Sequence, residues 1–337
     1  MAAKIAAPAR EEAMRSGVQA ALLALVGLCA SVPVAHAQNW PSKPITWVVP
    51  FGAGGGADVV SRIIAAALGE ELKTTFVIEN KPGASSTIGT RAIATAEPDG
   101  YTVGLLTDVH PVNVATGQAV PYDAFQDLAY ISQLITVPMV LYGSPQRSLK
   151  TLKEVIEYGK ANPGKLTAAS IGPATPHHLT MQWLASMAGV RMTIVPYRSI
   201  PQGLQALVTG EADLQWVGAA AGEDLIATGK ILQLGVATRQ RLSRAPDMPT
   251  LIEQGYPDFE MISFYGLVAP KKTPQNIIEK LHQALVTISS NPAVRQRVEA
   301  AGATLTITRP AEFEQLMRDS MDKFQRIADA AKVESKP

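Results

Sequence analysis

The sequence predicts an α/β fold with two domains, and three features of the chain indicate it. Short, β-rich apolar runs alternate with longer segments that have helical periodicity. Because strand–helix–strand order favours parallel pairing, this alternation is typical of α/β proteins. About 300 residues follow an N-terminal export signal, and a chain of that length usually divides into two domains.

The strand and helix signals follow one another in a regular order. The expected strands lie at 45–49, 76–78, 101–106, 166–170, 193–196, 213–217, 232–238 and 261–269. The expected helices run through 60–68, 91–95, 149–161, 179–187, 204–208, 274–288 and 310–331.

The N-terminus has the layout of a secretory signal peptide. From Met14 a short basic start leads into an apolar run, 20–34, that is too short for a comfortable membrane span. The small-x-small site Ala35-His36-Ala37 follows it. We therefore expect residues 1–37 to be removed by cleavage after Ala37 and the mature chain to be periplasmic. The alternative is an uncleaved membrane anchor.

Two details of this leader bear on its processing. Glu11 and Glu12 suit a signal peptide poorly, so the true start is either Met1 or Met14. Cys29 could indicate lipid attachment, but the residue before it is a leucine, which is too bulky for the usual attachment box. We interpret this cysteine as part of the discarded signal.

Composition excludes several classes of partner. The chain has 30 basic and 29 acidic residues, of which residues 1–37 hold three and two, so the mature chain is formally neutral at 27 of each. Neutrality argues against a nucleic-acid or anionic-membrane partner. Without a cysteine the mature chain has no disulfides and no cysteine metal site. Without a second long apolar run, we expect no membrane insertion of the mature chain.

Two turns of similar composition, 50–58 and 170–178, each follow a strand and open a helix. A helix N-terminus presents unpaired backbone N–H groups and the positive end of the helix dipole, so it suits an anion. If both turns face one cleft, they can hold a carboxylate without a buried lysine or arginine.

The glycine-rich turn also matches a dinucleotide-binding pattern. Gly52–Ala57 satisfies Gly-x-Gly-x-x-Ala, and Glu79 ends the next strand. An exported protein rarely meets free dinucleotide, and Asp58 would lie badly near a pyrophosphate, so we interpret the glycines as conformational. Asp58 either interacts with the first helical turn or projects into the cleft toward an amine or hydroxyl of the ligand.

The histidines form no catalytic or metal motif. His177 and His178 are adjacent, so their side chains diverge, and there is no His-x-x-x-His pair and no Gly-x-Ser-x-Gly elbow. We expect no catalytic residue, metal or cofactor, and we do not expect an enzyme. His110 and His178 lie beside turns, where they are candidates for hydrogen bonding, and Phe51 is a candidate wall of a ligand pocket.

Short motifs run in order along essentially the whole mature chain. They are Trp40–Ile45, Val49–Phe51 with Asp58, Glu79–Ala84, Pro98–Thr102, Pro121–Asp123, Asn162–Leu166, His178–Leu179, Val195–Tyr197, Gly210–Asp213 and Gly266–Pro270. In these motifs the chain resembles the tripartite tricarboxylate transporter receptors, the Bug family of periplasmic solute-binding proteins.

The resemblance implies a type II periplasmic binding protein fold, with two α/β lobes joined by a two-segment hinge and a ligand cleft between them. We expect lobe one over 40–136 and 236–337, and lobe two over 137–235. The implied function is capture of a small carboxylate and its delivery to the membrane components of a tripartite tricarboxylate-type transporter, by a monomeric receptor. The alternatives are a secreted α/β hydrolase or oxidoreductase, or the ligand-binding accessory of a sensor kinase.

By position, the resemblance also implies a set of ligand-binding residues, drawn from both lobes. They are Phe51, Gly55, Gly56, Asp58, Thr107, His110 and Asn113 in lobe one, and Ser170, Gly172, Thr175, His178, Tyr197 and Asp213 in lobe two. The chain departs from the family pattern at Asp108, where a small hydroxyl residue is common, and at Pro173 and Pro176, which stiffen the second turn. Asp108 could repel a second carboxylate or attract an amine.

Overall fold

A computed structural model describes residues 40–331 of the chain. Contacts divide the chain after Ser42, and every element below lies in the unit that begins at Lys43. The signal peptide, its cleavage after Ala37 and Cys29 lie outside the described residues and stay predictions.

Ten strands of the described residues form a mixed sheet in the order β2-β1-β3-β9-β4-β7-β5-β6, with β8 and β10 also paired to β4. The pairs β1–β2, β1–β3, β5–β6 and β5–β7 are parallel, as the strand–helix–strand order predicts. The strands are β1 (Ile45–Val49), β2 (Phe76–Asn80), β3 (Thr102–Thr107), β4 (Leu128–Gly143), β5 (Leu166–Ser170), β6 (Met192–Pro196), β7 (Leu214–Gly218), β8 (Leu232–Val236), β9 (Ile262–Pro270) and β10 (Thr304–Leu305).

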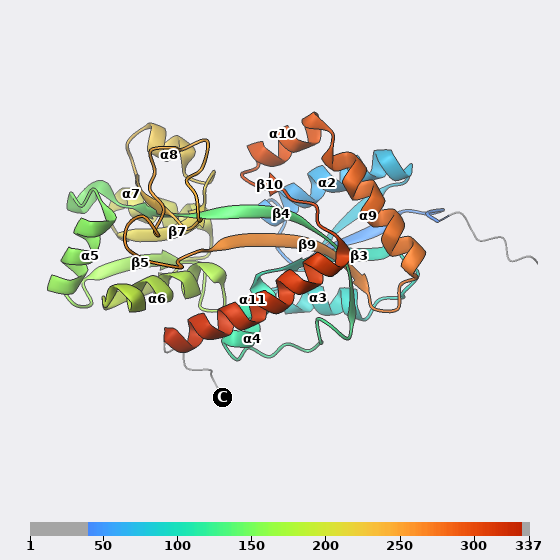
Figure 1. The fold of residues 1–337 in the computed structure, drawn as a ribbon, viewed down its shortest axis with the longest axis horizontal. Helices are drawn as coiled ribbons and strands as arrows, with labels where there is room; N and C mark the ends of the chain where they lie inside the picture. Colours follow the sequence, from blue (N-terminus) through green and yellow to red (C-terminus); the bar gives the residue numbers. More distant parts are fainter. Residues whose placement is uncertain (1–39, 332–337) are drawn as a thin grey trace, which may run out of the picture. The chain divides into compact units, whose positions relative to one another are not determined.

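The long strand β4 joins the two groups of parallel strands. Residues 128–138 pair antiparallel with β9, and residues 139–143 pair with β7 and β8. Pro138 lies at the point where the partner changes, a position that tolerates proline because the regular ladder is interrupted there. Figure 1 shows β4 and β9 running side by side, with helices grouped around both halves of the sheet.

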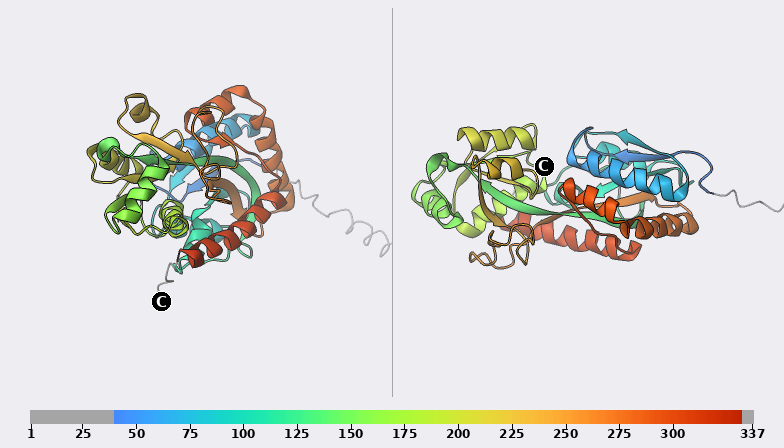
Figure 2. Two further views of the ribbon diagram at one scale, coloured as in Figure 1. Left: turned by 60° about the vertical axis from the view of Figure 1, so that its left-hand side comes forward. Right: turned by 90° about the horizontal axis from the view of Figure 1, so that it is seen from above.

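Helices cover both faces of the sheet (Figure 2), and several begin where the sequence supplies a cap. Thr151 and Glu154 form a capping box at α5, and Thr175 caps α6, which ends at a left-handed Gly189. The helices are α2 (Gly56–Leu72), α3 (Thr87–Ala94), α4 (Val109–Ala115), α5 (Leu152–Ala161), α6 (Pro176–Ala188), α7 (Ile200–Thr209), α8 (Glu223–Ala227), α9 (Gln275–Ser289), α10 (Pro292–Ala300) and α11 (Pro310–Ala330), with a 3-10 turn, η1, at Pro145–Arg147.

Helix α11 packs against elements that are far apart in the sequence. It contacts α4, β4 and α6, and the Ser186 hydroxyl at the end of α6 donates to the Ala330 carbonyl at 2.8 Å. Its buried Phe324 and Ile327 belong to the same apolar cluster as Trp216 and Phe259. The rings of Trp216 and Phe259 stack with centroids 5.6 Å apart, so an aromatic core anchors the last turns of α11.

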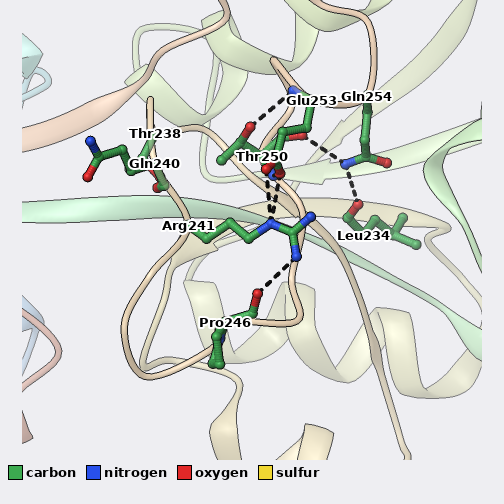
Figure 3. A network of polar contacts seen from close by, with 8 residues as sticks. All are labelled: Leu234, Thr238, Gln240, Arg241, Pro246, Thr250, Glu253 and Gln254. Atoms are coloured by element: carbon green, nitrogen blue, oxygen red, sulfur yellow. Dashed lines mark hydrogen bonds and ion pairs between the residues drawn. The ribbon is translucent and has the colours of Figure 1, made fainter.

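The long connection from β8 to β9 is fixed by polar contacts around Arg241 (Figure 3). Arg241 Nε donates to both carboxylate oxygens of Glu253, at 3.0 and 2.9 Å, and Nη1 donates to the Pro246 carbonyl at 3.0 Å. Glu253 also accepts from the Thr250 N–H at 2.8 Å. The Thr250 N–H and then Arg241 lower the pKa of Glu253. Gln254 donates to the Leu234 carbonyl at 3.0 Å and so connects this segment to β8.

Candidate functional site

A cavity of about 260 Å³ lies where the starts of α2, α6 and α7 approach the middle of β4 and β9. Its lining is mostly aliphatic and includes no lysine, arginine, aspartate or glutamate; His177, Ser263 and Tyr265 are its polar side chains. The lining residues are Gly56, Val60, Ile135, Val137, Met139, His177, Ile200, Val217, Gly218, Ala220, Ala221, Ser263, Tyr265, Ala300, Ala301, Gly302 and Ala303. A mostly apolar, concave site with a few polar groups is typical of a small-molecule pocket.

Asp58 holds the glycine turn at the start of α2. Its carboxylate is 3% exposed; Oδ2 accepts from the Gly54 N–H at 2.9 Å and from Arg62 Nε at 3.0 Å, and Oδ1 accepts from Asn80 Nδ2 at 2.9 Å. The hydrogen bond from Arg62 is the main reason that the pKa of Asp58 falls to about 2. Gly54 has a φ of 79°, a left-handed conformation that favours glycine. The carboxylate therefore acts on the turn and on Arg62.

Phe51 and Thr107 lie behind the cavity wall, beside Tyr265. The Phe51 ring stacks on the Tyr265 ring with centroids 6.5 Å apart and planes 27° apart. Thr107, at the end of β3, pairs with Tyr265 across the β3–β9 ladder. Burial, with a smaller contribution from Asp108, raises the pKa of Tyr265, so this phenol stays neutral and can donate a hydrogen bond.

Asp108 follows β3 and is 1% exposed. Its N–H donates to the Phe264 carbonyl at 3.3 Å. Its Oδ2 is buried without a hydrogen-bond partner in the described part of the chain. Burial raises the pKa of Asp108 to about 7, although the Ser263 hydrogen bond opposes the shift. Since Ser263 and Tyr265 line the cavity, this carboxyl lies one side chain behind its wall.

His110 and Asn113 make their contacts away from the cavity. His110 Nδ1 lies 3.0 Å from the Tyr122 hydroxyl, and the two rings stack with centroids 5.3 Å apart. Burial lowers the pKa of His110 to about 4. Asn113 Nδ2 donates to the Ser85 carbonyl at 2.7 Å. Neither residue is among those that line the cavity.

The turn before α6 is held by neutral side chains. Ser170 Oγ lies 3.0 Å from His178 Nδ1 and accepts from the Gly172 N–H at 3.3 Å, while Thr175 Oγ1 donates to the Gly172 carbonyl at 2.7 Å. Gly172 has a φ of 120°. The neighbouring His177 lines the cavity; its Nδ1 is buried without a partner among the described residues, and burial lowers its pKa to about 4.

Tyr197 and Asp213, the two other predicted residues of lobe two, lie at different parts of the fold. The Tyr197 N–H donates to the Ser170 carbonyl at 2.7 Å, which ties the end of β6 to the turn. Asp213 precedes β7, and its carboxylate accepts from Arg147 Nε and from the Thr167 N–H at 2.8 Å. The cavity meets β7 at its far end, Val217–Gly218. Because five residues of a strand span about 16 Å, the structure does not bring Asp213 to the cavity.

Gly56 is the one predicted residue that lines the cavity directly, and Gly55, Phe51, Asp58 and Thr107 surround that part of the wall. Sequence reasoning missed most of the lining. It named His178 in place of His177 and did not name Tyr265. The missed lining residues are Val60, Ile135, Val137, Met139, His177, Ile200, Val217, Gly218, Ala220, Ala221, Ser263, Tyr265 and 300–303.

The structure has two groups of strands joined through β4, and helix starts from both groups meet at one cavity. This arrangement is the architecture of a periplasmic binding protein. The comparisons agree with this class. The solved structure of the periplasmic binding protein BugD is 29% identical, with a TM-score of 0.78, and the match covers 88% of this chain and 99% of that one. The structure described as R. palustris Rpa4515 with adipate is 27% identical, with a TM-score of 0.81, covering 87% and 99%.

The sequence comparison supplies the family. Residues 60–333 match the family described as tripartite tricarboxylate transporter family receptor. A UPF0065 protein of Bordetella pertussis is 34% identical over 278 residues, which are 80% of this chain and 84% of that protein. This chain therefore belongs to the tripartite tricarboxylate transporter family receptors, and the resemblance seen in its motifs is confirmed. Over residues 40–331, no helix is long and apolar enough to cross a membrane.

Proposed function

We propose that this protein is an extracytoplasmic receptor that captures a small carboxylate-bearing ligand in the cavity and delivers it to the membrane components of a tripartite tricarboxylate-type transporter. The observation that carries the proposal is the convergence of two helix starts on one cavity, at Gly56 of α2 and at His177 of α6. Family membership and the adipate on Rpa4515 support the same ligand class.

The carboxylate would be held by partial charges. No lysine or arginine lines the cavity, so the attraction would come from backbone N–H groups and from the dipoles of α2 and α6. The Tyr265 hydroxyl and the neutral His177 ring can add hydrogen bonds. Because Arg62 neutralises Asp58, the acidic residue in the first turn of α2 does not oppose an anion at full strength.

The cavity would close by rotation of lobe one, 40–136 and 236–337, against lobe two, 137–235. The pairing of β4 supports this division, since its partner changes from β9 to β7 between Pro138 and Met139. The second crossing of this division would lie at residues 235–236, at the end of β8. Rotation there would bring the starts of α2 and α6 onto one ligand, as hinge closure does in binding proteins of this kind.

We interpret the Ser170–His178 contact as structural and not catalytic, so the protein would bind its ligand without converting it. Ser170 is 0% exposed, and its hydroxyl also accepts from the Gly172 N–H, so it presents no nucleophile to a substrate. We further propose a periplasmic, monomeric mature protein that begins at Gln38. Mass spectrometry of protein recovered from the periplasm would test both its N-terminus and its mass.

A thermal-shift screen with carboxylates, acidic amino acids and nucleotides, followed by mass spectrometry of the recovered ligand, tests the function. A ligand that binds only the folded state raises the melting temperature. At a hundredfold excess over Kd, it adds about 2.7 kcal/mol to the free energy of unfolding. We expect stabilisation by a carboxylate that is recovered unchanged. Stabilisation by NAD alone, or conversion of the bound carboxylate, would contradict the proposal.

A further inference from the structure

We infer that the cavity selects ligands with one carboxylate and an uncharged apolar body, and that Asp108 is the residue that disfavours a second carboxylate. This inference deepens the proposed function and rests on it.

The cavity is small and mostly aliphatic. Its volume of about 260 Å³ leaves room for a small organic acid. Most of the wall that such a ligand would touch is aliphatic, including Val60, Ile135, Val137 and Met139. An apolar body gains free energy by leaving water for this wall, whereas a charged group there loses its hydration without a counter-charge.

Asp108 lies beside the wall of the cavity. Its N–H donates to the carbonyl of Phe264, the residue between Ser263 and Tyr265, so Asp108 lies next to two residues of the wall. Among residues 40–331, its buried Oδ2 has no hydrogen-bond partner and no lysine or arginine lines the cavity to compensate it. Repulsion between like charges is strong where water is excluded, so Asp108 opposes every negative charge that enters.

One carboxylate can still bind, because the helix starts offset that repulsion. A second carboxylate would lie in the aliphatic part of the cavity, where no lysine or arginine lines the wall. Asp58 and Asp108 differ in how their charges are balanced. Arg62 balances the charge of Asp58, whereas no basic side chain among residues 40–331 bonds the buried carboxyl of Asp108.

Matched acids of equal chain length provide the test. Binding of hexanoate and adipate, and of benzoate and terephthalate, is measured by calorimetry at pH 8 on the purified protein, on Asp108→Asn and on Asp319→Asn. The Asp319 carboxylate is a matched control because it lies on α11 and contacts Gln315 on the exposed surface. We expect each monoacid to bind at least tenfold more tightly than its diacid. Asp108→Asn should reduce that ratio at least fivefold, and Asp319→Asn should leave it unchanged.

The outcomes separate the two proposals. If no carboxylate binds, the proposed function fails, and this inference fails with it. If the diacids bind as tightly as the monoacids, or if Asp108→Asn folds and keeps the ratio, the function stands and this inference is overturned. Tighter binding of 6-aminohexanoate than of hexanoate would show that Asp108 attracts an amine. That result would contradict the inference that the cavity selects ligands with an uncharged body.

Acid titration provides a second test, with Asp108→Asn as the reference. Asp108 changes charge near pH 7, whereas its neighbour Tyr265 stays neutral, and His110 on α4 and His177 at the wall have pKa values of about 4. Between pH 8 and pH 6 the diacids also begin to gain a proton, which lowers the monoacid-to-diacid ratio in both proteins, and the protonation of Asp108 should lower it severalfold further in the wild type. Equal decreases in the wild type and in Asp108→Asn would contradict the role given to Asp108.

Discussion

The two helix starts at the cavity have similar backbones but are stabilised by different chemistry. The turn before α2 depends on a buried carboxylate with an arginine, Asp58 with Arg62, whereas the turn before α6 depends on neutral groups such as Ser170, Thr175 and His178. A charged network is stronger but fails when its acid is protonated, and a neutral turn loses stability when a buried histidine beside it gains a proton. The two halves of one site should therefore respond differently to mutation and to pH.

The largest expected effect comes from Asp58→Ala. The change leaves the Gly54 N–H without its acceptor, removes one of the two acceptors of Asn80 Nδ2 and leaves Arg62 without its counter-charge, so we expect a loss of about 3 kcal/mol in the free energy of unfolding. Carboxylate affinity should fall at least tenfold because the start of α2 loses its shape. Urea unfolding and calorimetry measure the two effects. Unchanged stability with lost affinity would instead indicate that Asp58 contacts the ligand directly.

The two turns should also lose stability in different pH ranges. The pKa of Asp58 is lowered from 3.8 to about 2, so its contribution is complete above about pH 4 and is lost as the pH falls toward 2. The pKa of His177 is lowered from 6.5 to about 4, because burial disfavours the charged ring. The neutral ring is therefore favoured above pH 6.5, and stability declines as the pH falls from 6.5 to 4.

This difference can be measured with His177→Gln. The wild-type protein should lose about 2 kcal/mol more than the variant between pH 7 and pH 4.5. Chemical denaturation at both pH values gives the comparison. Parallel losses in the two proteins would show that His177 does not titrate with folding.

The smallest expected effect is that of Thr175→Ala at the start of α6. The change removes the side chain that accepts from the His178 N–H and donates to the Gly172 carbonyl, which should cost about 1 kcal/mol. Thr175→Ser keeps the hydroxyl and should remain within about 0.5 kcal/mol of the wild type. A loss as large as that of Asp58→Ala would mean that the neutral turn is no weaker than the charged one.

The sequence predicted the parts of this fold that depend on local patterns. Periodicity, glycine turns and helix caps all act over a few residues. They predicted the two helix starts and the parallel strand units at 45–106 and 166–217. The strand β4 was missed because it has 16 residues, is mostly buried and contains Pro138, features that hide the alternation of a half-buried strand.

The cavity was predicted less well, because its wall is assembled from distant segments. Ala300–Ala303 reaches it from the loop after α10, and Tyr265 reaches it from β9, where sequence alone cannot distinguish a cavity wall from core. His177 and His178 are neighbours on a helix, and their directions differ by about 100°. Which ring faces the cavity depends on how α6 is rotated against the sheet, and no local pattern encodes that angle.

Helix α11 would restrict the proposed rotation of the two lobes. It packs against α4 on one side of the division and against α6 on the other, and the bond from Ser186 to Ala330 secures its end. A rotation that preserves these contacts must turn about an axis close to this helix, so displacement increases with distance from it. Gly302 and Ala220 both line the cavity, and they lie so close that an added Cβ on Gly302 would be 2.6 Å from the alanine Cβ. Over residues 40–331 no hydrogen bond joins these two residues, so the proposed rotation could separate them without breaking one.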